Sequence, residues 1–444
     1  VMLESQEMRK VYCDTMIALA KEDPRIVDVE ADLTGAHGMK PFKAAYTDRS
    51  FNVGIAEANM VGVAAGLSAC GKIPFVHSFA TFASRRCFDQ IAISVCYAGL
   101  NVKIVGSDPG VGAELNGGTH MALEDMGIMR TLPGMTVFEP TDSVQLRKAL
   151  PAIVEHEGPV YIRLFRRQAE NVFDDDYEFD LGKADLLRDG SDVTLIASGV
   201  CVANALQAAE TLAQEGVSAR VLNIHTIKPI DADAVIKAAS ETGALVTAEN
   251  HNVIGGLGSA VAEVLAEQRP TPLERVGVKD HFGQVGKAPY LMGVFGITAA
   301  DIAKAARKAI DASKCTIMTE AEWLNPKTGF NKANNSWMWY LPQSTEGIAN
   351  LVNFAAWRSS EATWGYGGKY VFEGVTSNFY NEISDTDWRK RAFVGPDAKY
   401  ADYSDITNLT AAQFANLPAY ANLKFHPAEG ETATYSVGNV TDIP

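Results

Sequence analysis

The sequence predicts an α/β protein built from two doubly wound parallel-sheet domains, followed by a segment of different character. Short apolar runs rich in β-branched residues alternate with longer amphipathic stretches over residues 1–313. This alternation is typical of buried parallel strands covered by helices. The acidic run at residues 174–178 interrupts the alternation once, and composition changes again after residue 315.

The first domain, residues 1–170, is expected to form a parallel sheet with helices on both faces. Its apolar runs are bounded by Gly, Pro or charged residues, as buried strands are. The expected strands are residues 26–30, 73–78, 102–106, 136–139 and 160–165. Helical patterns lie between them, at about residues 5–21, 55–70, 83–98, 121–130 and 142–155.

A linker, residues 171–184, leads to the second domain, residues 185–315. Its expected strands are residues 193–197, 219–224, 244–248 and 273–278, and Thr298 is expected to cap a last helix over 299–313. Parallel sheets of this kind bind ligands beyond the carboxyl ends of their strands. Functional residues are therefore expected in the loops between strands and helices.

Residues 316–444 differ in composition from the rest of the chain. All six Trp lie within this segment, whereas all six Cys precede it. One domain under one set of packing demands would rarely divide so sharply. We therefore predict two segments of different origin joined near residues 314–318, and limited proteolysis that cuts near 314–326.

Charge and cysteine content exclude several classes of protein. The net charge of −15 argues against nucleic acid or an anionic membrane surface as the main partner. No apolar run reaches the ~20 residues that span a bilayer, and the charged N-terminus shows no secretory signal. Six cysteines without a Cys-x-x-Cys pattern predict reduced thiols, no structural zinc and a cytoplasmic location.

Glu57 is the first candidate for chemistry. It begins a run of small apolar residues, predicted to be a helix packed tightly on both sides, and no Lys or Arg lies within six residues of it. An acid at this place can simply favour the helix dipole, worth ~0.3–1 kcal/mol. A buried carboxylate can instead share a proton with a ligand nitrogen. Spacing alone leaves both interpretations open.

Residues 51–60 closely resemble the conserved glutamate segment of transketolases. The resemblance implies that Glu57 contacts the aminopyrimidine ring of thiamine diphosphate and, by proton exchange, drives formation of the reactive ylide. It covers residues 7–313 and implies the pyrimidine-binding and C-terminal domains of that family. Residues 247–258 carry the clearest mark of the C-terminal domain, and glycines there would permit anion binding at a helix start. We expect no catalytic residue in that domain, which mainly supports the dimer.

Three further segments resemble the same family. Residues 74–82 match a strand-to-helix segment whose aromatic residues pack on the pyrimidine, here Phe79 and Phe82. Residues 112–120 match the loop that ends in the substrate-contacting histidine, here His120. Asp32 matches an acidic residue near the cofactor. Taken alone, the two phenylalanines would more simply be core residues and His120 a residue at a helix start.

Substrate contacts are expected from arginines and from two positions that depart from the family. Arg166 and Arg9 resemble arginines that hold the sugar phosphate, a role that suits a planar guanidinium, although Arg9 could equally be a solvated helix residue. Asn116 falls where transketolases have an aspartate that contacts the donor hydroxyl, and Asp108 where they have a histidine. A carboxylate close to a phosphate is unfavourable, so the sugars remain open.

A missing motif predicts a partner. Transketolases hold the diphosphate through a divalent metal, using Gly-Asp-Gly followed by Asn, and no Gly-Asp-Gly occurs in this sequence. The resemblance therefore implies a split enzyme, in which an N-terminal transketolase subunit holds the phosphates with Mg²⁺ or Ca²⁺. This chain would have no metal site of its own and would join a dimer of heterodimers.

The expected activity is thiamine-diphosphate-dependent transfer of a two-carbon ketol unit between sugar phosphates, as in the pentose phosphate pathway. The beta subunit of a 2-oxo acid dehydrogenase shares the two-domain plan and is the alternative, disfavoured by His120 and Arg166. Residues 316–444 resemble, at 384–391 and 420–425, an internal fragment of SusD-like glycan-binding outer-membrane lipoproteins. A glycan-binding surface scaffold is thus a third hypothesis, which rests on this segment alone.

Overall fold

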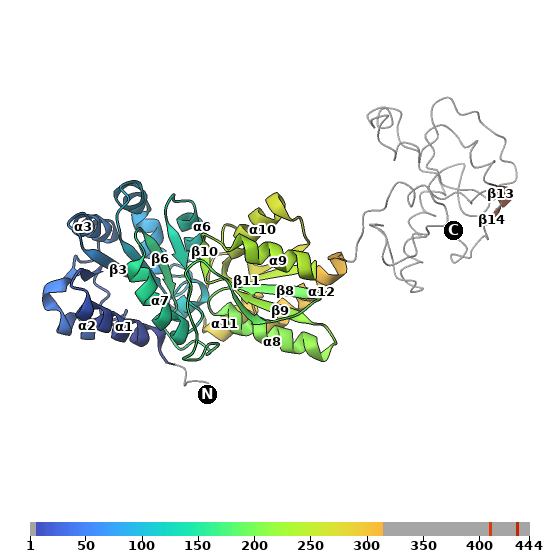
Figure 1. The fold of residues 1–444 in the computed structure, drawn as a ribbon, viewed down its shortest axis with the longest axis horizontal. Helices are drawn as coiled ribbons and strands as arrows, with labels where there is room; N and C mark the ends of the chain where they lie inside the picture. The colour runs from blue at the N-terminus through green and yellow to red at the C-terminus, as the bar shows by residue number, and fades with distance from the viewer. Residues whose placement is uncertain (1–5, 314–407, 411–431, 435–444) are drawn as a thin grey trace, which may run out of the picture. The chain divides into compact units, whose positions relative to one another are not determined.

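The computed structural model of the protein describes residues 6–313 together with 408–410 and 432–434. The chain divides into two compact units, Val1–Ser313 and Lys314–Pro444 (Figure 1). In the second unit, β13 (Asn408–Thr410) pairs with β14 (Thr432–Thr434) in antiparallel fashion. The rest of the predicted SusD-like fragment lies outside the described residues.

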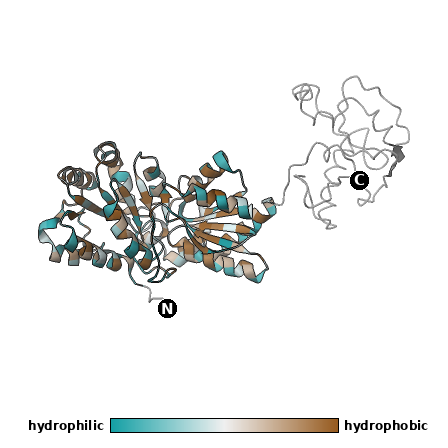
Figure 2. Cartoon of the chain, in the orientation of Figure 1, coloured by the Kyte–Doolittle hydropathy of each residue, from teal (hydrophilic) through white to brown (hydrophobic). Residues whose placement is uncertain are grey.

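The first sheet has seven strands in the order β10-β5-β6-β4-β3-β1-β2. Its strands are parallel except β10, which runs antiparallel to β5 at the edge. The central strands are largely apolar, and brown stretches mark them in Figure 2, but they also carry buried polar residues such as Asp28, Glu30 and Arg163. The strands are β1 (Ile26–Glu30), β2 (Ser50–Asn52), β3 (Ile73–Phe79), β4 (Lys103–Ser107), β5 (Thr136–Phe138), β6 (Val160–Leu164) and β10 (Thr226–Lys228).

Helices cover both faces of this sheet, as the sequence predicts. On one face α1 (Met8–Glu22) packs against α7 (Ser143–Glu155), and α2 (Lys40–Ala45) lies beside α1 (Figure 1). On the other face are α3 (Glu57–Ala69) and the short helices that follow β3. The expected helix over 83–98 is instead broken into shorter pieces: α4 (Ala80–Ser84), η2 (Arg85–Cys87), α5 (Phe88–Gln90) and η3 (Ile91–Tyr97), the last a π-helix.

The second sheet has five strands in the order β12-β11-β8-β9-β7, with β7 antiparallel to β9. Separate apolar cores lie on its two faces, under α8 and α12 on one side and under α9 and α10 on the other. Its strands are β7 (Asp185–Arg188), β8 (Val193–Ala197), β9 (Ala219–Asn223), β11 (Leu245–Asn252) and β12 (Leu273–Val278). Its helices are α8 (Cys201–Gln214), α9 (Ala232–Thr242), α10 (Leu257–Gln268), α11 (Ala288–Phe295) and α12 (Ala299–Ser313).

The predicted cap of α12 is confirmed and is reciprocal. The backbone N–H of Asp301 donates to Thr298 Oγ1 over 3.4 Å, and the backbone N–H of Thr298 donates to Asp301 Oδ2 over 3.1 Å. Two N–H groups that the helix leaves unpaired are thereby satisfied. The expected helix over 121–130 is shorter than predicted, because α6 (Asp125–Arg130) begins only at Asp125.

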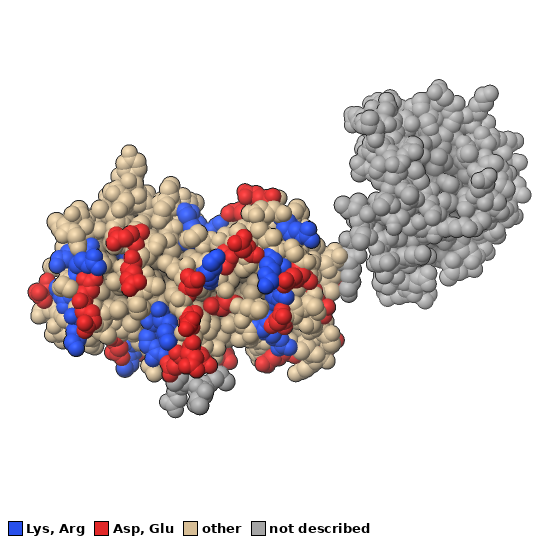
Figure 3. Space-filling view, viewed as in Figure 1, with Lys and Arg blue, Asp and Glu red and all other residues tan. Residues whose placement is uncertain are grey.

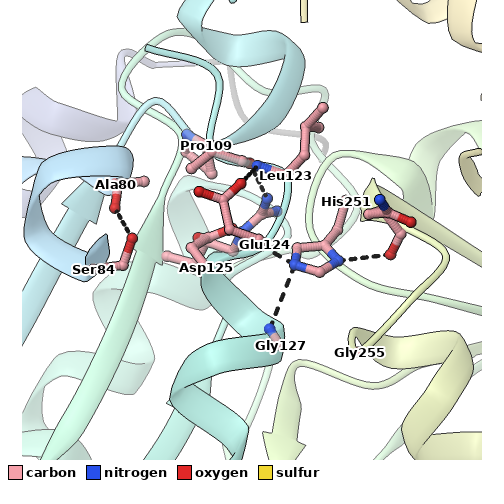
Figure 4. Close-up of polar contacts among 12 residues, drawn as sticks. Ala80, Ser84, Pro109, Leu123, Glu124, Asp125, Gly127, His251 and Gly255 are labelled. Carbon is pink, nitrogen blue, oxygen red and sulfur yellow. Dashed lines mark hydrogen bonds and ion pairs between the residues drawn. The ribbon is translucent and has the colours of Figure 1, made fainter. Parts of the chain in front are cut away.

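Buried polar contacts join the two α/β domains. The fully buried Arg163 donates from Nε to Asp125 over 2.9 Å and from Nη2 to the carbonyl of Asn250, in the second domain, over 2.7 Å. Nearby, the backbone N–H of Gly127 donates to His251 Nε2 over 3.4 Å (Figure 4). Together with β10, these contacts make residues up to Ser313 one unit.

Acidic and basic side chains are interspersed on the face of this unit that Figure 3 shows. No single sign of charge covers that face, although acidic residues outnumber basic ones in the whole sequence. Within the described residues, none of the helices has the length and apolar character that a membrane crossing requires.

Candidate active site

Glu57 is the first residue of α3 and is almost completely buried, with 5% of its surface exposed. Its Oε1 accepts hydrogen bonds from Arg86 Nη1 over 3.0 Å and from Ser78 Oγ over 3.5 Å. Ser78 lies near the carboxyl end of β3, so the carboxylate sits at the sheet edge where ligands are expected. The residues around Glu57 do not indicate Arg86 as its partner, because Arg86 is 29 residues away in the chain.

α3 is buried on one face only in this chain, which differs from the expectation of packing on both sides. Met60, Val61 and Ala64 are buried, whereas Gly62 and Gly66 are exposed. The small residues of this helix thus leave an outward face that is not covered within residues 6–313.

Three rings meet beside Glu57. The centroids of Phe79 and Phe82 are 6.2 Å apart, and the imidazole of His120 lies 5.6 Å from the first and 5.1 Å from the second. All three pairs are edge-to-face, an arrangement that aromatic rings favour. Arg86 lies over the Phe82 ring at 3.8 Å and Arg166 over the Phe79 ring at 4.9 Å. The residues predicted from separate motifs therefore form one continuous cluster.

The two predicted arginines converge on a single backbone oxygen. Arg166 Nη1 donates to the carbonyl of Ala36 over 2.6 Å, and Arg9 Nη1 donates to the same oxygen over 3.1 Å. Each guanidinium also bonds to one carboxylate through its Nε and Nη2. Arg166 pairs with Asp108, over 2.8 Å from Nε, and Arg9 with Glu7, over 3.2 Å and 2.9 Å.

The other three predicted polar residues differ in their surroundings. Asp108 is buried and has a positive φ of 50°. Asp32 is exposed, and its Oδ1 accepts from Asn52 Nδ2 over 3.0 Å, which ties it to the segment that leads to Glu57. Asn116 is exposed at the end of η4 (Gly110–Asn116), just before the loop that carries His120.

A buried polar cluster under this site was not predicted. Asp28 and Glu30 on β1 face His77 on β3, and His77 Nδ1 lies 3.0 Å from Asp28 Oδ1. Tyr12 shares a hydrogen bond of 2.8 Å with His77 Nε2, and His37 Nδ1 lies 3.1 Å from Glu30 Oε2. Strand alternation could have revealed it, because two acids two residues apart on a fully buried strand must share one face.

Burial controls the protonation of this cluster. It raises the pKa of Glu30 well above its usual range and lowers that of His37 well below. Burial alone would also lower the pKa of His77, but the hydrogen bond and charge of Asp28 outweigh it and raise that pKa. The expected assignment is therefore a neutral Glu30 and His37 beside a His77–Asp28 ion pair.

Asp28, Glu30 and His77 are also the one group among the described residues whose ligand atoms lie close enough together, within 4.8 Å, to hold a metal ion. Asp28 Oδ1 and His77 Nδ1 form an ion pair at 3.0 Å, and Ser50 Oγ donates to Asp28 Oδ2 over 2.5 Å. The group is buried, and Asp28 Oδ1, Glu30 Oε1 and His77 Nδ1, which face one another, have no hydrogen-bond partner of regular geometry. The absence of a metal site in this chain stays a prediction.

The glycine-rich segment of the second domain, residues 247–258, bonds to a carboxyl group of the same segment. Glu249 accepts backbone hydrogen bonds from Leu257, over 2.7 Å, and from Gly258, over 2.9 Å, at the start of α10. A Cβ on Gly256 would lie 2.0 Å from Glu249 Oε2. Burial raises the pKa of Glu249 to about 7. The anion site expected from these glycines is therefore already filled by Glu249.

The cluster formed by Glu57, Phe79, Phe82 and His120 suits a flat heteroaromatic ligand. A buried carboxylate can exchange a proton with a ring nitrogen, and Phe79 and Phe82 offer apolar edges and faces. These residues fit the aminopyrimidine of thiamine diphosphate. The fold and this cluster together define a two-domain α/β protein with an acid, an aromatic pair and a histidine at one sheet edge.

Comparison with known proteins identifies the family. Residues 4–171 match the transketolase pyrimidine-binding domain, and residues 182–302 match the transketolase C-terminal domain. The chain belongs to the transketolase family.

Individual relatives are named as transketolase subunits, and one solved structure is named as a split gene transketolase. The 6-deoxy-6-sulfo-D-fructose transketolase subunit SqwH of Clostridium sp. (strain MSTE9) is 58% identical over 311 residues, which cover 70% of this chain and 97% of that protein. An apulose-4-phosphate transketolase subunit of Phocaeicola vulgatus (strain ATCC 8482) is 39% identical over 299 residues, covering 67% and 96%. A solved structure described as a split gene transketolase, inactive beta4 tetramer, is 45% identical with a TM-score of 0.64, covering 69% and 98%.

Proposed function

We propose that this chain is the C-terminal subunit of a split transketolase that transfers a two-carbon ketol unit with thiamine diphosphate. The proximity of Glu57, Phe82 and His120, which are linked through Arg86 and the ring contacts, carries the proposal. In the overall reaction the C2–C3 bond of a ketose breaks, and C2 of the released two-carbon unit bonds to the carbonyl carbon of an acceptor aldehyde. The donor's C3 hydroxyl proton is lost and the acceptor oxygen gains one, so no oxidant is needed.

Each residue of the cluster has a distinct part. When bound, thiamine diphosphate supplies the nucleophilic carbon that the protein lacks. Glu57 holds or releases the proton at the pyrimidine nitrogen, and the low exposure of this carboxylate keeps water from competing. Phe79 and Phe82 pack on the ring. His120, whose ring contacts both phenyl rings, would donate a hydrogen bond to an oxygen of the sugar.

The arginines point to a donor with an anionic end. Arg9 and Arg166 converge next to Phe79, and such guanidinium pairs bind strongly acidic groups through their N–H donors. Relatives are named for a sulfo-sugar and for a sugar phosphate. We therefore include a ketose sulfonate beside the sugar phosphates as a donor for this site.

Exposed apolar side chains next to Glu57 support the need for a partner. Ile55 is 76% exposed, and Ile93 and Tyr97 of the π-helix beside α3 are 58% and 87% exposed. Apolar surface of this kind marks protein interfaces. The partner is an N-terminal subunit that supplies the diphosphate site and its Mg²⁺ or Ca²⁺, in a dimer of heterodimers in the cytoplasm.

Reconstitution tests the function. The full chain, an N-terminal subunit with a Gly-Asp-Gly segment, thiamine diphosphate and Mg²⁺ are mixed with ketose donors and an aldehyde acceptor. Formation of the ketose extended from the acceptor supports the proposal, and either subunit alone should give none. Decarboxylation of pyruvate or a branched 2-oxo acid by the same mixture, without ketol transfer, would favour the dehydrogenase alternative.

A further inference from the structure

The anionic end of the site has an unusual balance of charge. Arg9 and Arg166 are the two cations that meet at the carbonyl of Ala36, and each is paired with its own carboxylate, Glu7 or Asp108. The formal charges of these four side chains sum to zero. The site therefore differs from a plain arginine pair, which would present two uncompensated positive charges to a ligand.

The remaining hydrogen-bond donors can be counted. A guanidinium has five N–H groups. Arg166 uses two on Asp108 and one on Ala36, and Arg9 uses two on Glu7 and one on the same carbonyl. Each arginine thus keeps two donors, on its Nη atoms, for a ligand. The clamp offers up to four hydrogen bonds to oxygen atoms without offering net charge.

A clamp of this kind discriminates by ligand charge. The cost of removing an anion from water grows with the square of its charge, whereas attraction to a fixed site grows only in proportion to the charge and the site's net charge. A dianion therefore loses more than a monoanion when the site is neutral overall. Asp108 contributes most to this loss, because only 1% of its side chain is exposed and water screens it poorly.

We propose that Glu7, Arg9, Asp108 and Arg166 form a charge-balanced clamp that selects a singly charged terminal sulfonate over a phosphate dianion, with Asp108 as the specificity-determining residue. The inference rests on the proposed function and names the substrate class of the same site. A sulfonate has three acceptor oxygens and a single charge at every physiological pH. A phosphate monoester loses its second proton near pH ~6 and is mostly a dianion above it.

The test compares two donors that differ only at the terminal group, 6-deoxy-6-sulfofructose and fructose 6-phosphate, in the reconstituted enzyme. The wild-type kcat/KM should favour the sulfonate at pH ~8 by about tenfold or more. Asp108→Asn should shift the ratio toward the phosphate by about tenfold, mainly through KM. Asn tolerates the positive φ of this residue, so the fold should persist.

Two further variants complete the design. Glu7→Gln should shift the ratio in the same direction but less, because the Arg9–Glu7 pair is 34% and 43% exposed. Glu215→Gln is the matched control, since it removes a carboxylate from an exposed ion pair with Arg307 in the second domain and should leave the ratio unchanged. Lowering the pH through ~6 should narrow the wild-type preference as phosphate becomes a monoanion.

The outcomes separate the two proposals. Transfer from both donors with a preference for phosphate, or a ratio that neither Asp108→Asn nor Glu7→Gln alters, would overturn the charge-balanced clamp and leave the ketol transfer standing. Failure of every ketose donor, sulfonated or phosphorylated, would instead overturn the proposed function.

Discussion

Arg86 and Glu57 are joined by a 3.0 Å hydrogen bond from Nη1 to Oε1, although they belong to different helical segments, one before and one after β3 in the chain. The same guanidinium lies over the ring of Phe82. Arg86 is half exposed whereas Glu57 is buried. The pair thus links the carboxylate to the aromatic cluster and has one side in contact with water.

The first prediction concerns the proton on Glu57. Glu57→Gln should lower ketol transfer by at least about a hundredfold, because an amide cannot exchange that proton. Thermal stability should change by less than about 1 kcal/mol, since Arg86 stays solvated when its partner becomes neutral. Transfer rates and unfolding curves of the two proteins are the measurements.

A control for this variant is Glu263→Gln, which removes a carboxylate from the Arg130 pair on α10. It should keep the transfer activity. A fully active Glu57→Gln enzyme would show that Glu57 only favours the helix dipole.

The second prediction concerns pH and Glu30. Its pKa is raised in the fold by burial, so the neutral acid is the favoured form. The stabilisation that Glu30 contributes is therefore fully present below pH ~4.3, the pKa of a glutamate in the unfolded chain. It is lost as the pH rises from there through the raised pKa of the folded state. The raised pKa of His77 acts in the same direction, because its charged form is lost as the pH rises.

Glu30→Gln keeps a neutral side chain at every pH, so it should remove part of the loss of folding stability that accompanies a rise in pH. Relative to wild type it should gain stability as the pH rises from ~4.3 to about 8, by at most about 1.4 kcal/mol per pH unit. Urea denaturation across that range measures the difference. If the free energy of unfolding varied with pH in the same way for both proteins, a raised pKa of Glu30 would be contradicted.

Sequence alone could predict the central strands and the edge strand β12, but not three short edge strands. β2, β7 and β10 were missed because they are three or four residues long and incompletely buried. β10 is the hardest case, since it pairs with β5 from the other half of the chain. No local pattern of residues specifies such a pairing, which depends on how the two domains pack.

Sequence likewise could predict the members of the site but not their pairing. The structure brings Glu57, His120 and Arg166, which separate motifs suggested, into one region, and their roles stay predictions. The motifs did not show that Arg86 contacts Glu57, or that Asp108 pairs with Arg166. Both contacts join residues far apart in the chain, so their geometry follows from strand order rather than from spacing.

The third prediction concerns the buried cation between the domains. Arg163 is fully enclosed and contacts Asp125, Glu139 and the carbonyl of Asn250. Arg163→Met would leave two buried carboxylates without a cation and should cost about 3–5 kcal/mol. Arg307→Met removes an exposed pair and should cost less than about 1 kcal/mol. Equal losses in the free energy of unfolding of the two variants, measured by urea denaturation, would disprove a special role for burial.

The fourth prediction compares two glycines. Gly256→Ala should destabilise the protein by about 1–3 kcal/mol, because its Cβ would press on the Glu249 carboxylate that caps α10. Gly293→Ala lies inside α11 with nothing within 4 Å of the added carbon. It should be neutral or stabilise by up to about 1 kcal/mol. The difference between the two melting temperatures is the decisive measurement.

The fifth prediction concerns residues 314–444. The apolar side of α12 packs on the second sheet, so this helix completes an apolar core formed among residues 6–313. The matched families end at residue 302, and 311 residues of this chain account for 97% of the SqwH relative. A chain cut after Ser313 should therefore fold, assemble with the N-terminal subunit and retain its transfer rate within about twofold. Loss of cooperative unfolding or of assembly in the shortened chain would mean that both segments share one core, contrary to the predicted separate origin.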